Sequence, residues 1–348
     1  MTPEEVKEVK EDIQIQSSTT GEAAAAEANP GGVWGIIKRL FSFREAGILF
    51  VLIAICVFLS IATPNFLTEK NIMNVARQFS VIAIIAVGMT YVIVTAGIDL
   101  SVGSIVAFSG CMTAMALVNG WSIPVSIAVG IVLGTLVGLL NGFLIVKVNL
   151  APFIATLGTM GIARGLVLAF TKGYPIQPFP EEFEVIGRGF IGPLPIPVVI
   201  MLVIVICGHL LLSRTTLGRY IYYVGSNPTA ARLSGLKVGR VLVFAYTAAG
   251  FLSGLASVVL ISRLTSAQSN MGQGWELDAI AAVVIGGTSL SGGEGSVIGS
   301  LIGAALMGVI RNALILLGVN VYWQSVVIGV VIVLAVAIDA FRQKRRVV

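Results

Sequence analysis

The chain has 348 residues, of which 56% are hydrophobic and only 11% are charged, with a formal net charge of +5. Soluble globular domains carry about 25% charged residues, so this composition excludes an ordinary soluble protein. Apolar runs of about 20 residues, which cross about 30 Å of hydrocarbon as a helix, predict an all-α, polytopic membrane helix bundle. The basic excess lies in short connecting loops, which indicates membrane topology and not a nucleic-acid partner.

The N-terminal region has a different composition from the rest. Residues 1–32 contain seven Asp or Glu and two Lys, a net charge of −5. A signal peptide begins basic and turns apolar at once, so we predict a disordered acidic cytoplasmic tail instead. Residues 33–45 mix Trp and Phe with Lys and Arg, which is typical of an interfacial amphipathic segment on the membrane surface. The alternative is plain flanking sequence before the first span.

Apolar segments predict about ten transmembrane helices in a single transmembrane domain at 46–342. They lie at 46–62, 75–96, 103–119, 123–146, 151–170, 194–212, 241–262, 278–290, 296–317 and 321–340. The eighth segment is short, and Gly-rich connections leave several segment boundaries poorly defined. An even number of spans places both termini on the same side of the membrane.

The distribution of Lys and Arg decides which side that is. With the N-terminus inside, thirteen of these residues lie in short inner segments and five lie in outer loops. The outer five are Lys70, Arg77, Lys172, Arg188 and Arg263. We therefore expect both termini in the cytoplasm, a basic cytoplasmic tail at 343–348, and the 171–193 loop outside. The prolines of that loop predict an irregular surface.

Glycine repeats every fourth residue from Gly130 to Gly142, and again from Gly295 to Gly303. Such stripes let helix backbones approach closely in lipid, where water no longer drives association. We interpret them as packing surfaces. The alternative is a sliding seam used in transport.

The sequence offers no catalytic, cofactor-binding or metal-binding motif. His209 stands alone, and the cysteines lie inside apolar segments without metal-ligand spacing. A phosphate loop is excluded, because the dipeptide Gly-Lys does not occur in the chain. Leu290–Glu294 reads LSGGE and resembles the signature of ABC-type ATPases, but no other ATPase motif accompanies it. We interpret it as a Gly-rich bend between spans, and we expect no ATP hydrolysis by this chain.

The longest inner loop, 213–240, predicts a short capped helix. Asn227 and Pro228 are preferred at the N-cap and N1 positions, and Gly235 is preferred at a left-handed C-terminal cap. A short exposed helix flanked by Arg and Lys is typical of a docking element. The alternative is an ordinary loop whose basic residues set the topology.

Four stretches resemble the permeases of ribose-type sugar ABC importers, a binding-protein-dependent transport family. They are AGIDLSVGS at 96–104, the loop at 225–235, QGWELDAIAAVVIGGTSL at 273–290, and YWQ at 322–324. The resemblance covers about residues 45–342, and the acidic tail is not part of the family pattern.

The resemblance implies a permease subunit in a bacterial inner (plasma) membrane, with several partners. A second permease copy or a homologous permease would complete the path through the lipid. An ABC ATPase subunit or a tandem ATPase would dock beneath it, and a periplasmic or lipid-anchored sugar-binding protein would deliver the sugar above. The loop at 226–236 looks like the element that couples the path to the ATPase. Its candidate residues are Asn227, Pro228, Ala230, Arg232 and Gly235.

Polar residues in the spans are the candidates for a translocation path or gate, because buried polar groups in lipid are costly. They are Asp99, Asn141, Arg164, Gln268, Glu276, Asp278, Arg311 and Asn312. Asp99 is expected to cap the third span and orient a sharp turn, with lining of the path as the alternative. Arg311 is expected to pair with Glu276 or Asp278. The amides of Asn141, Gln268 and Asn312 offer hydrogen bonds to a hydroxyl-rich solute.

The preferred function is therefore import of a monosaccharide, ribose-like or related, with energy from a separate ATPase. Permeases of the same superfamily for autoinducer-2, nucleosides or branched-chain amino acids are the nearest alternative. An autonomous secondary transporter is a further one. It should carry ionisable residues at the midplane of its helices, where this sequence has few.

Overall fold

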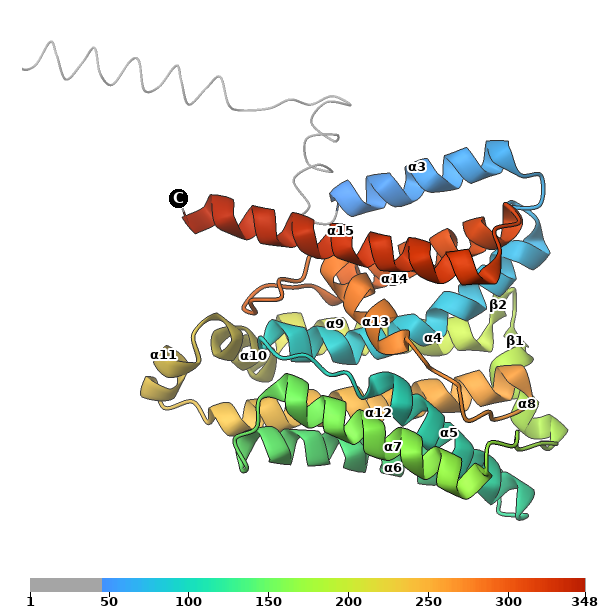
Figure 1. The fold of residues 1–348 in the computed structure, drawn as a ribbon, viewed down its shortest axis with the longest axis horizontal. Coiled ribbons are helices and arrows are strands. Elements are labelled where there is room, and N and C mark those ends of the chain that lie inside the picture. Colours follow the sequence, from blue (N-terminus) through green and yellow to red (C-terminus); the bar gives the residue numbers. More distant parts are fainter. Residues whose placement is uncertain (1–45, 348) are drawn as a thin grey trace, which may run out of the picture. The chain divides into compact units, whose positions relative to one another are not determined.

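The structure, a computed structural model, describes residues 46–347 (Figure 1). The predicted tail at 1–32 and the amphipathic segment at 33–45 lie outside the described residues. The longer helices are α3 (Ala46–Ala62), α4 (Glu69–Val94), α5 (Val102–Val118), α6 (Ile123–Val146), α7 (Pro152–Thr171), α9 (Ile196–Arg214), α12 (Val238–Leu264), α14 (Val297–Leu316) and α15 (Val321–Val347). The shorter elements are α8 (Glu181–Arg188), β1 (Phe190–Ile191), β2 (Leu194–Pro195), α10 (Thr216–Ser226), α11 (Pro228–Leu233) and α13 (Trp275–Ile285).

Six of the described helices are long and apolar enough to cross a membrane, namely α4, α6, α7, α9, α12 and α14. Shorter apolar segments are also present, namely helices α3 and α5 and the stretch Tyr322–Leu334 within α15. The predicted eighth span, 278–290, corresponds to α13, which has 11 residues. A helix of that length covers roughly 17 Å, less than the hydrocarbon core. The helical membrane bundle is thus confirmed, whereas the number of ten spans and the side of the termini stay predictions.

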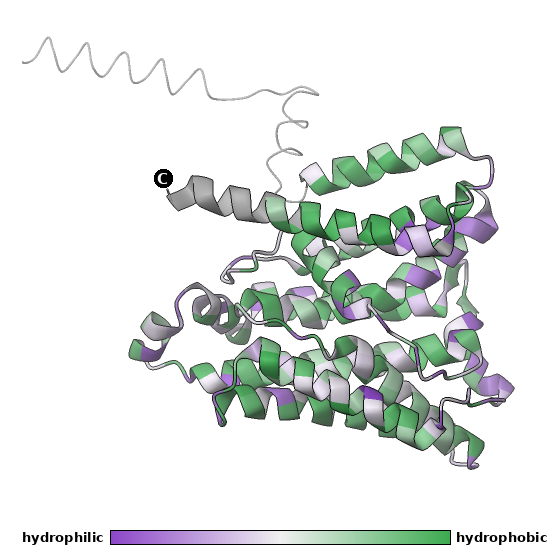
Figure 2. Ribbon diagram, viewed as in Figure 1, coloured by the Kyte–Doolittle hydropathy of each residue, from purple (hydrophilic) through white to green (hydrophobic). Residues whose placement is uncertain are grey.

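The outward faces of the bundle are apolar (Figure 2). Leu136 on α6, Ile154 on α7 and Ile206 on α9 are among many large hydrophobic side chains that are exposed. A soluble monomer rarely exposes contiguous apolar surface on this scale, whereas lipid solvates it readily.

Glycines bring the central helices into backbone contact. A Cβ atom on Gly134 would lie 2.7 Å from the carbonyl oxygen of Gly250, and one on Gly88 would lie 2.7 Å from the Cα of Ala249. The Gly stripe of α6 therefore faces α12, and Gly88 of α4 faces it from another side. The interpretation of this stripe as a packing surface is confirmed, because larger side chains would separate the helices.

Eight of the described helices form two sets with equivalent contacts, α4–α7 and α12–α15. In the first set α5 packs against α6, α7 and α12, and in the second set α13 packs against α14, α15 and α4. Helices α4 and α12 pack against each other, and α5 meets α13. This exchange symmetry is typical of transporters built from internal repeats. Irregular segments at 95–101 and 265–274 occupy equivalent places in the two sets.

The two ends of the bundle differ in structure (Figure 1). One end carries α10, α11 and the loop between α13 and α14, and the other carries α8 with the β1–β2 hairpin. The prediction of an irregular surface in the 171–193 loop is wrong for this part. Helix α8 forms because three acids occupy its first turn and Arg188 its last, which complements the helix dipole. An ion pair of 3.0 Å between Glu184 and Arg188 adds to it.

Candidate translocation path and coupling helix

A sharp turn around Asp99 joins α4 to α5. Helix α4 ends at Val94, and Ala96 adopts a left-handed φ of 62°, which reverses the chain. The Asp99 Oδ1 atom then accepts hydrogen bonds from the backbone N–H of Ser101 at 2.8 Å and from its hydroxyl at 2.5 Å. The prediction that Asp99 orients this turn is confirmed. The prediction that Asp99 caps this span is wrong, because Ser101 occupies the N-cap position of α5.

A buried hydrogen-bond chain extends from this turn into two helices. The Asn141 amide on α6 donates to the Ser101 hydroxyl at 2.8 Å, and the Thr159 hydroxyl on α7 donates to the Asn141 carbonyl oxygen at 2.6 Å. Asp99, Ser101 and Asn141 are completely buried, and Thr159 nearly so. Since both ends of the Asn141 amide are engaged, this chain fixes the α4–α5 turn against α6 and α7. Sequence reasoning missed it, because its members lie up to 60 residues apart.

A second cluster surrounds the irregular segment between α12 and α13. The Arg164 guanidinium on α7 donates from one nitrogen to the carbonyl oxygens of Ser269 and Met271, at 2.8 and 2.9 Å. Glu276 lies close enough to attract Arg164 electrostatically. The exposed Gln268 belongs to the same segment. The structure thus brings together three of the path candidates, Arg164, Gln268 and Glu276.

The first turn of α5 meets the irregular segment before α13 at a glycine pair. A Cβ atom on Gly103 would overlap the carbonyl oxygen of Gly272 and the carboxylate of Glu276, and one on Gly272 would overlap the carbonyl oxygen of Gly103. Only residues without a side chain permit this approach. The start of α5 and the segment before α13 therefore touch inside the bundle, between the two equivalent sets of helices.

The remaining candidates form two polar pairs. Arg311 on α14 forms an ion pair of 2.5 Å with Asp278 on α13, whose side chain is 3% exposed, so the expected pairing is confirmed. Asn312 exchanges two hydrogen bonds with Asn71 on α4, at 2.8 and 3.0 Å. Both pairs fasten α14 to its neighbours. Neither pair shares a residue with the hydrogen-bond chain from Asp99 to Thr159.

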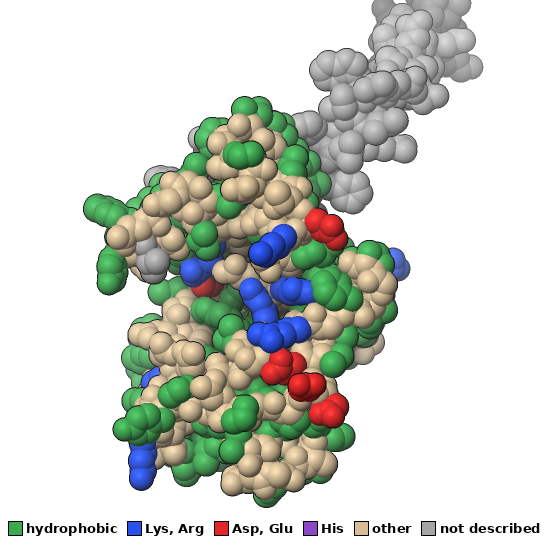
Figure 3. Space-filling model, turned by 90° about the vertical axis from the view of Figure 1, so that its right-hand side faces the viewer, with side chains coloured by type: hydrophobic (Ala, Val, Ile, Leu, Met, Phe, Trp, Pro, Cys, Tyr) green, Lys and Arg blue, Asp and Glu red, His purple; other side chains and the backbone are tan. Residues whose placement is uncertain are grey.

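Basic residues gather on the end of the bundle that carries α8 (Figure 3). Arg77 donates to the carbonyl oxygen of Arg188 at 3.2 Å and lies 4.6 Å above the Phe190 ring. Arg188 in turn donates to the carbonyl oxygen of Arg263 at 3.3 Å. Acidic side chains lie on the same face, among them those of α8. Sequence analysis identified these arginines only as separate outer charges, because no local pattern shows that they lie together.

The short capped helix predicted in the 213–240 loop is present. Helix α11 spans Pro228–Leu233, and the Asn227 side chain accepts a hydrogen bond from the backbone N–H of Ala230 at 2.9 Å. Gly235 has a φ of 82°, and the N–H of Leu236 donates to the carbonyl oxygen of Ala231 at 3.0 Å. The N-cap, the proline at N1 and the left-handed glycine cap are all confirmed. Ala230, Arg232 and Leu233 are exposed.

An additional helix, α10, connects this element to the bundle. Sequence reasoning missed it, although Thr215 is a good N-cap residue and Ile221 and Val224 are spaced for a buried face. A Cβ atom on Gly225 would overlap the carbonyl oxygen of Val94 at the end of α4. That same oxygen accepts a hydrogen bond of 2.9 Å from the N–H of Gly293. Helix α10 therefore packs closely against the last residue of α4 and the loop before α14.

The segment Leu290–Glu294 is a bend within this loop. The N–H of Ser289 donates to the carbonyl oxygen of Glu294 at 3.0 Å, and Gly292 and Gly293 have φ angles of 81° and 74°. This geometry confirms the prediction of a Gly-rich bend. Within residues 46–347, no group of three His, Cys, Asp or Glu residues could hold a metal ion.

The helical bundle and its polar junctions define an integral membrane permease, and comparison with known proteins gives the family. Residues 71–336 match the family described as branched-chain amino acid transport system / permease component. The chain is 48% identical over 307 residues to the ribose import permease protein RbsC of Bacillus subtilis, covering 88% of this chain and 94% of that protein. The chain therefore belongs to this permease family.

Two further relatives have similar coverage. Identity to the ribose import permease protein RbsC of Escherichia coli K12 is 44% over 313 residues, or 88% of this chain and 98% of that protein. Identity to the D-allose transport system permease protein AlsC of the same strain is 37% over 313 residues, or 88% and 96%. No solved structure matches the chain significantly.

Proposed function

We propose that the chain is the membrane-spanning subunit of an ABC importer that carries a ribose-like monosaccharide across the bacterial inner membrane. The observation that carries this proposal is the identity of 48% to a ribose import permease over nearly its whole length. A relative at 37% identity is named for D-allose, also a sugar. These names favour a sugar over the branched-chain amino acids of the family description.

In this proposal the path runs along the junction of the two irregular segments. Arg164, Gln268 and Glu276 lie beside the glycine contact and offer charged and amide groups to a hydroxyl-rich solute. The network from Asp99 to Asn141 would act as a gate, because it holds the α4–α5 turn in one position. The Asp278–Arg311 pair and Asn312 would keep α13 and α14 together while the gate moves.

The energy for this movement would come from an ATPase that docks on α11. The exposed Leu233 and Arg232 present an apolar and a cationic contact. A displacement of α11 would pass through α10 to Val94, since Gly225 leaves no space between them. Val94 ends the helix that leads into the Asp99 turn. The chain therefore offers a short continuous route from the docking helix to the proposed gate.

The other partners and the topology follow from the two ends of the bundle. The arginines around Arg77 suit acidic residues on a sugar-binding protein outside the cell, and α11 lies at the opposite, cytoplasmic end. Both termini would then be cytoplasmic, with ten spans formed by the six long helices, the three shorter apolar ones and the region of α13. A second copy or a homologous permease would complete the path.

The direct cellular test is uptake of radiolabelled ribose in a bacterium without its own ribose permease. The chain is expressed with its ATPase and binding protein, and uptake is measured with excess unlabelled ribose, leucine or adenosine. We expect competition by ribose alone. Competition by leucine or adenosine, or uptake that continues without the ATPase, would support the alternative permeases or a secondary transporter instead.

A further inference from the structure

We infer that a groove between α6 and α12 is a binding site for an anionic glycerophospholipid. The groove has a volume of about 790 Å³ and opens on the apolar surface of the bundle. Pockets that hold small-molecule ligands have volumes of about 300–1,000 Å³, so it can take part of a lipid. The inference concerns a surface away from the proposed path and does not depend on which solute is carried.

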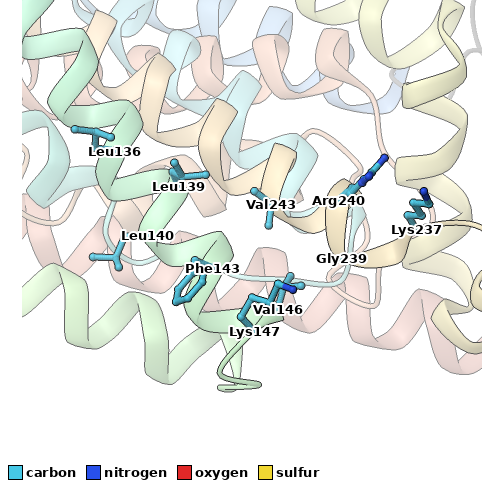
Figure 4. A pocket seen from close by; sticks show the side chains of 10 residues that line it. All are labelled: Leu136, Leu139, Leu140, Phe143, Val146, Lys147, Lys237, Gly239, Arg240 and Val243. Carbon is cyan, nitrogen blue, oxygen red and sulfur yellow. The ribbon is translucent and has the colours of Figure 1, made fainter.

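One wall of the groove suits an acyl chain. Leu136, Leu139, Leu140 and Phe143 lie on one face of α6 with helical spacing, and all four side chains are between 43% and 51% exposed. Figure 4 shows them in a row along the helix, with Val243 of α12 opposite. At the end of the groove α12 comes close to α6, since a Cβ atom on Gly239 would lie 2.6 Å from the side chain of Val146.

The same end of the groove carries three positive charges. Lys147 is the C-cap of α6, Lys237 is the N-cap of α12, and Arg240 lies in the first turn of α12 (Figure 4). All three are exposed, and none forms an ion pair with an acid among the described residues. The N-terminus of α12 adds a positive helix dipole.

An apolar groove that ends in cations without an acidic partner among the described residues matches a molecule with an apolar tail and an anionic head. Basic pockets between transmembrane helices bind the head groups of anionic lipids in this manner. A second copy of the chain fits less well. The acids Glu181, Glu182 and Glu184 lie on α8, at the opposite end of the bundle, so a copy with the same orientation would not bring them to these cations.

The test uses the full chain in detergent, mixed with equal amounts of phosphatidylglycerol and phosphatidylcholine, and native mass spectrometry to count bound lipids. We expect the wild type to retain one phosphatidylglycerol in preference to phosphatidylcholine. The double variant Lys147→Gln/Arg240→Gln should lose this preference roughly 25-fold, because each basic side chain near a lipid surface contributes roughly 5-fold. The matched control is Arg214→Gln/Arg219→Gln, which removes two exposed cations near the same end but outside the groove.

A second pair of variants tests the tail. Leu139→Trp places a large ring in the groove and should reduce retention of both lipids, whereas Leu210→Trp, on the exposed face of α9, should not. Unchanged melting temperatures would show that all four variants are folded. The inference is overturned by equal retention of the two lipids in the wild type, by an equal loss in groove and control variants, or by displacement of the lipid with millimolar inorganic phosphate. Disulfide cross-linking between two chains through Leu139→Cys, in a variant without the native cysteines, would show a second copy on this face and would also overturn it.

Discussion

Gly225 of α10 touches the carbonyl oxygen of Val94, the last residue of α4, so closely that no side chain fits between them. This contact joins α10, which leads to α11, to the helix that leads into the Asp99 turn. In the proposed function, any movement of α11 would reach α4 through Gly225.

The first prediction is that Gly225→Ala lowers both thermal stability and sugar uptake, whereas a Gly→Ala change at an uncrowded position does not. The new methyl group forces α10 away from α4, and overpacking of this kind costs about 1–3 kcal/mol. Gly161→Ala on α7 is the matched control, because its Cβ would have no neighbour within 4 Å. Thermal unfolding in detergent and sugar uptake should both fall for Gly225→Ala alone. Equal behaviour of the two variants would show that the contact is loose.

The second prediction concerns the cap of α11. Gly235→Val places a branched side chain at a φ of 82°, which strains the cap by roughly 1–2 kcal/mol. We expect normal membrane levels, weakened association with the ATPase and lost transport. Gly235→Asn should retain much of the function, because Asn tolerates the left-handed conformation. Wild-type uptake by Gly235→Val would mean that α11 is only a connector.

The third prediction concerns the Asp278–Arg311 ion pair. Arg311→Met leaves a buried carboxylate without its partner, a change that typically costs about 3–5 kcal/mol. The double variant Arg311→Met/Asp278→Asn removes the charge as well and should recover most of the lost stability. Unfolding of Arg311→Met, of Asp278→Asn and of the double variant is measured, and the three changes in stability give the coupling energy between the two side chains. Additive losses would contradict a direct pairing.

The fourth prediction tests the topology. In a variant without Cys56, Cys111 and Cys207, an impermeant maleimide applied to intact cells should label Glu182→Cys and not Ala230→Cys. Both positions are exposed, so access to the reagent depends on the side of the membrane. Permeabilised cells provide the control, since both sites should then react. Labelling of Ala230→Cys alone in intact cells would reverse the orientation.

Features encoded in short stretches were predictable from the sequence. The preferences of Asn227, Pro228 and Gly235 for helix ends depend only on neighbouring residues. Helix α11 has the bounds and caps that these preferences predict. The pairing of Arg311 with an acid was also predictable, because a buried charge in lipid needs a partner.

Features that depend on distant residues were not predictable. The hydrogen-bond chain from Asp99 to Thr159 requires the relative positions of α5, α6 and α7, which no local pattern contains. The boundaries of the eighth segment were wrong for a related reason. The apolar run 278–290 includes Gly287, whose left-handed φ of 89° follows the C-cap Gly286 and ends α13 at Ile285, and hydropathy does not distinguish a helix from a buried apolar bend.

The central claim is that this chain forms the path for a sugar in an ATP-driven importer. The most direct measurement is uptake of radiolabelled ribose into proteoliposomes that contain the chain, its ATPase and its binding protein, with ATP supplied on the side of the ATPase. We predict ribose accumulation that requires all three proteins and ATP hydrolysis, and that stops with Gly235→Val. Accumulation driven by an ion gradient in the absence of ATP, or ATP-dependent accumulation of leucine but not ribose, would contradict the account.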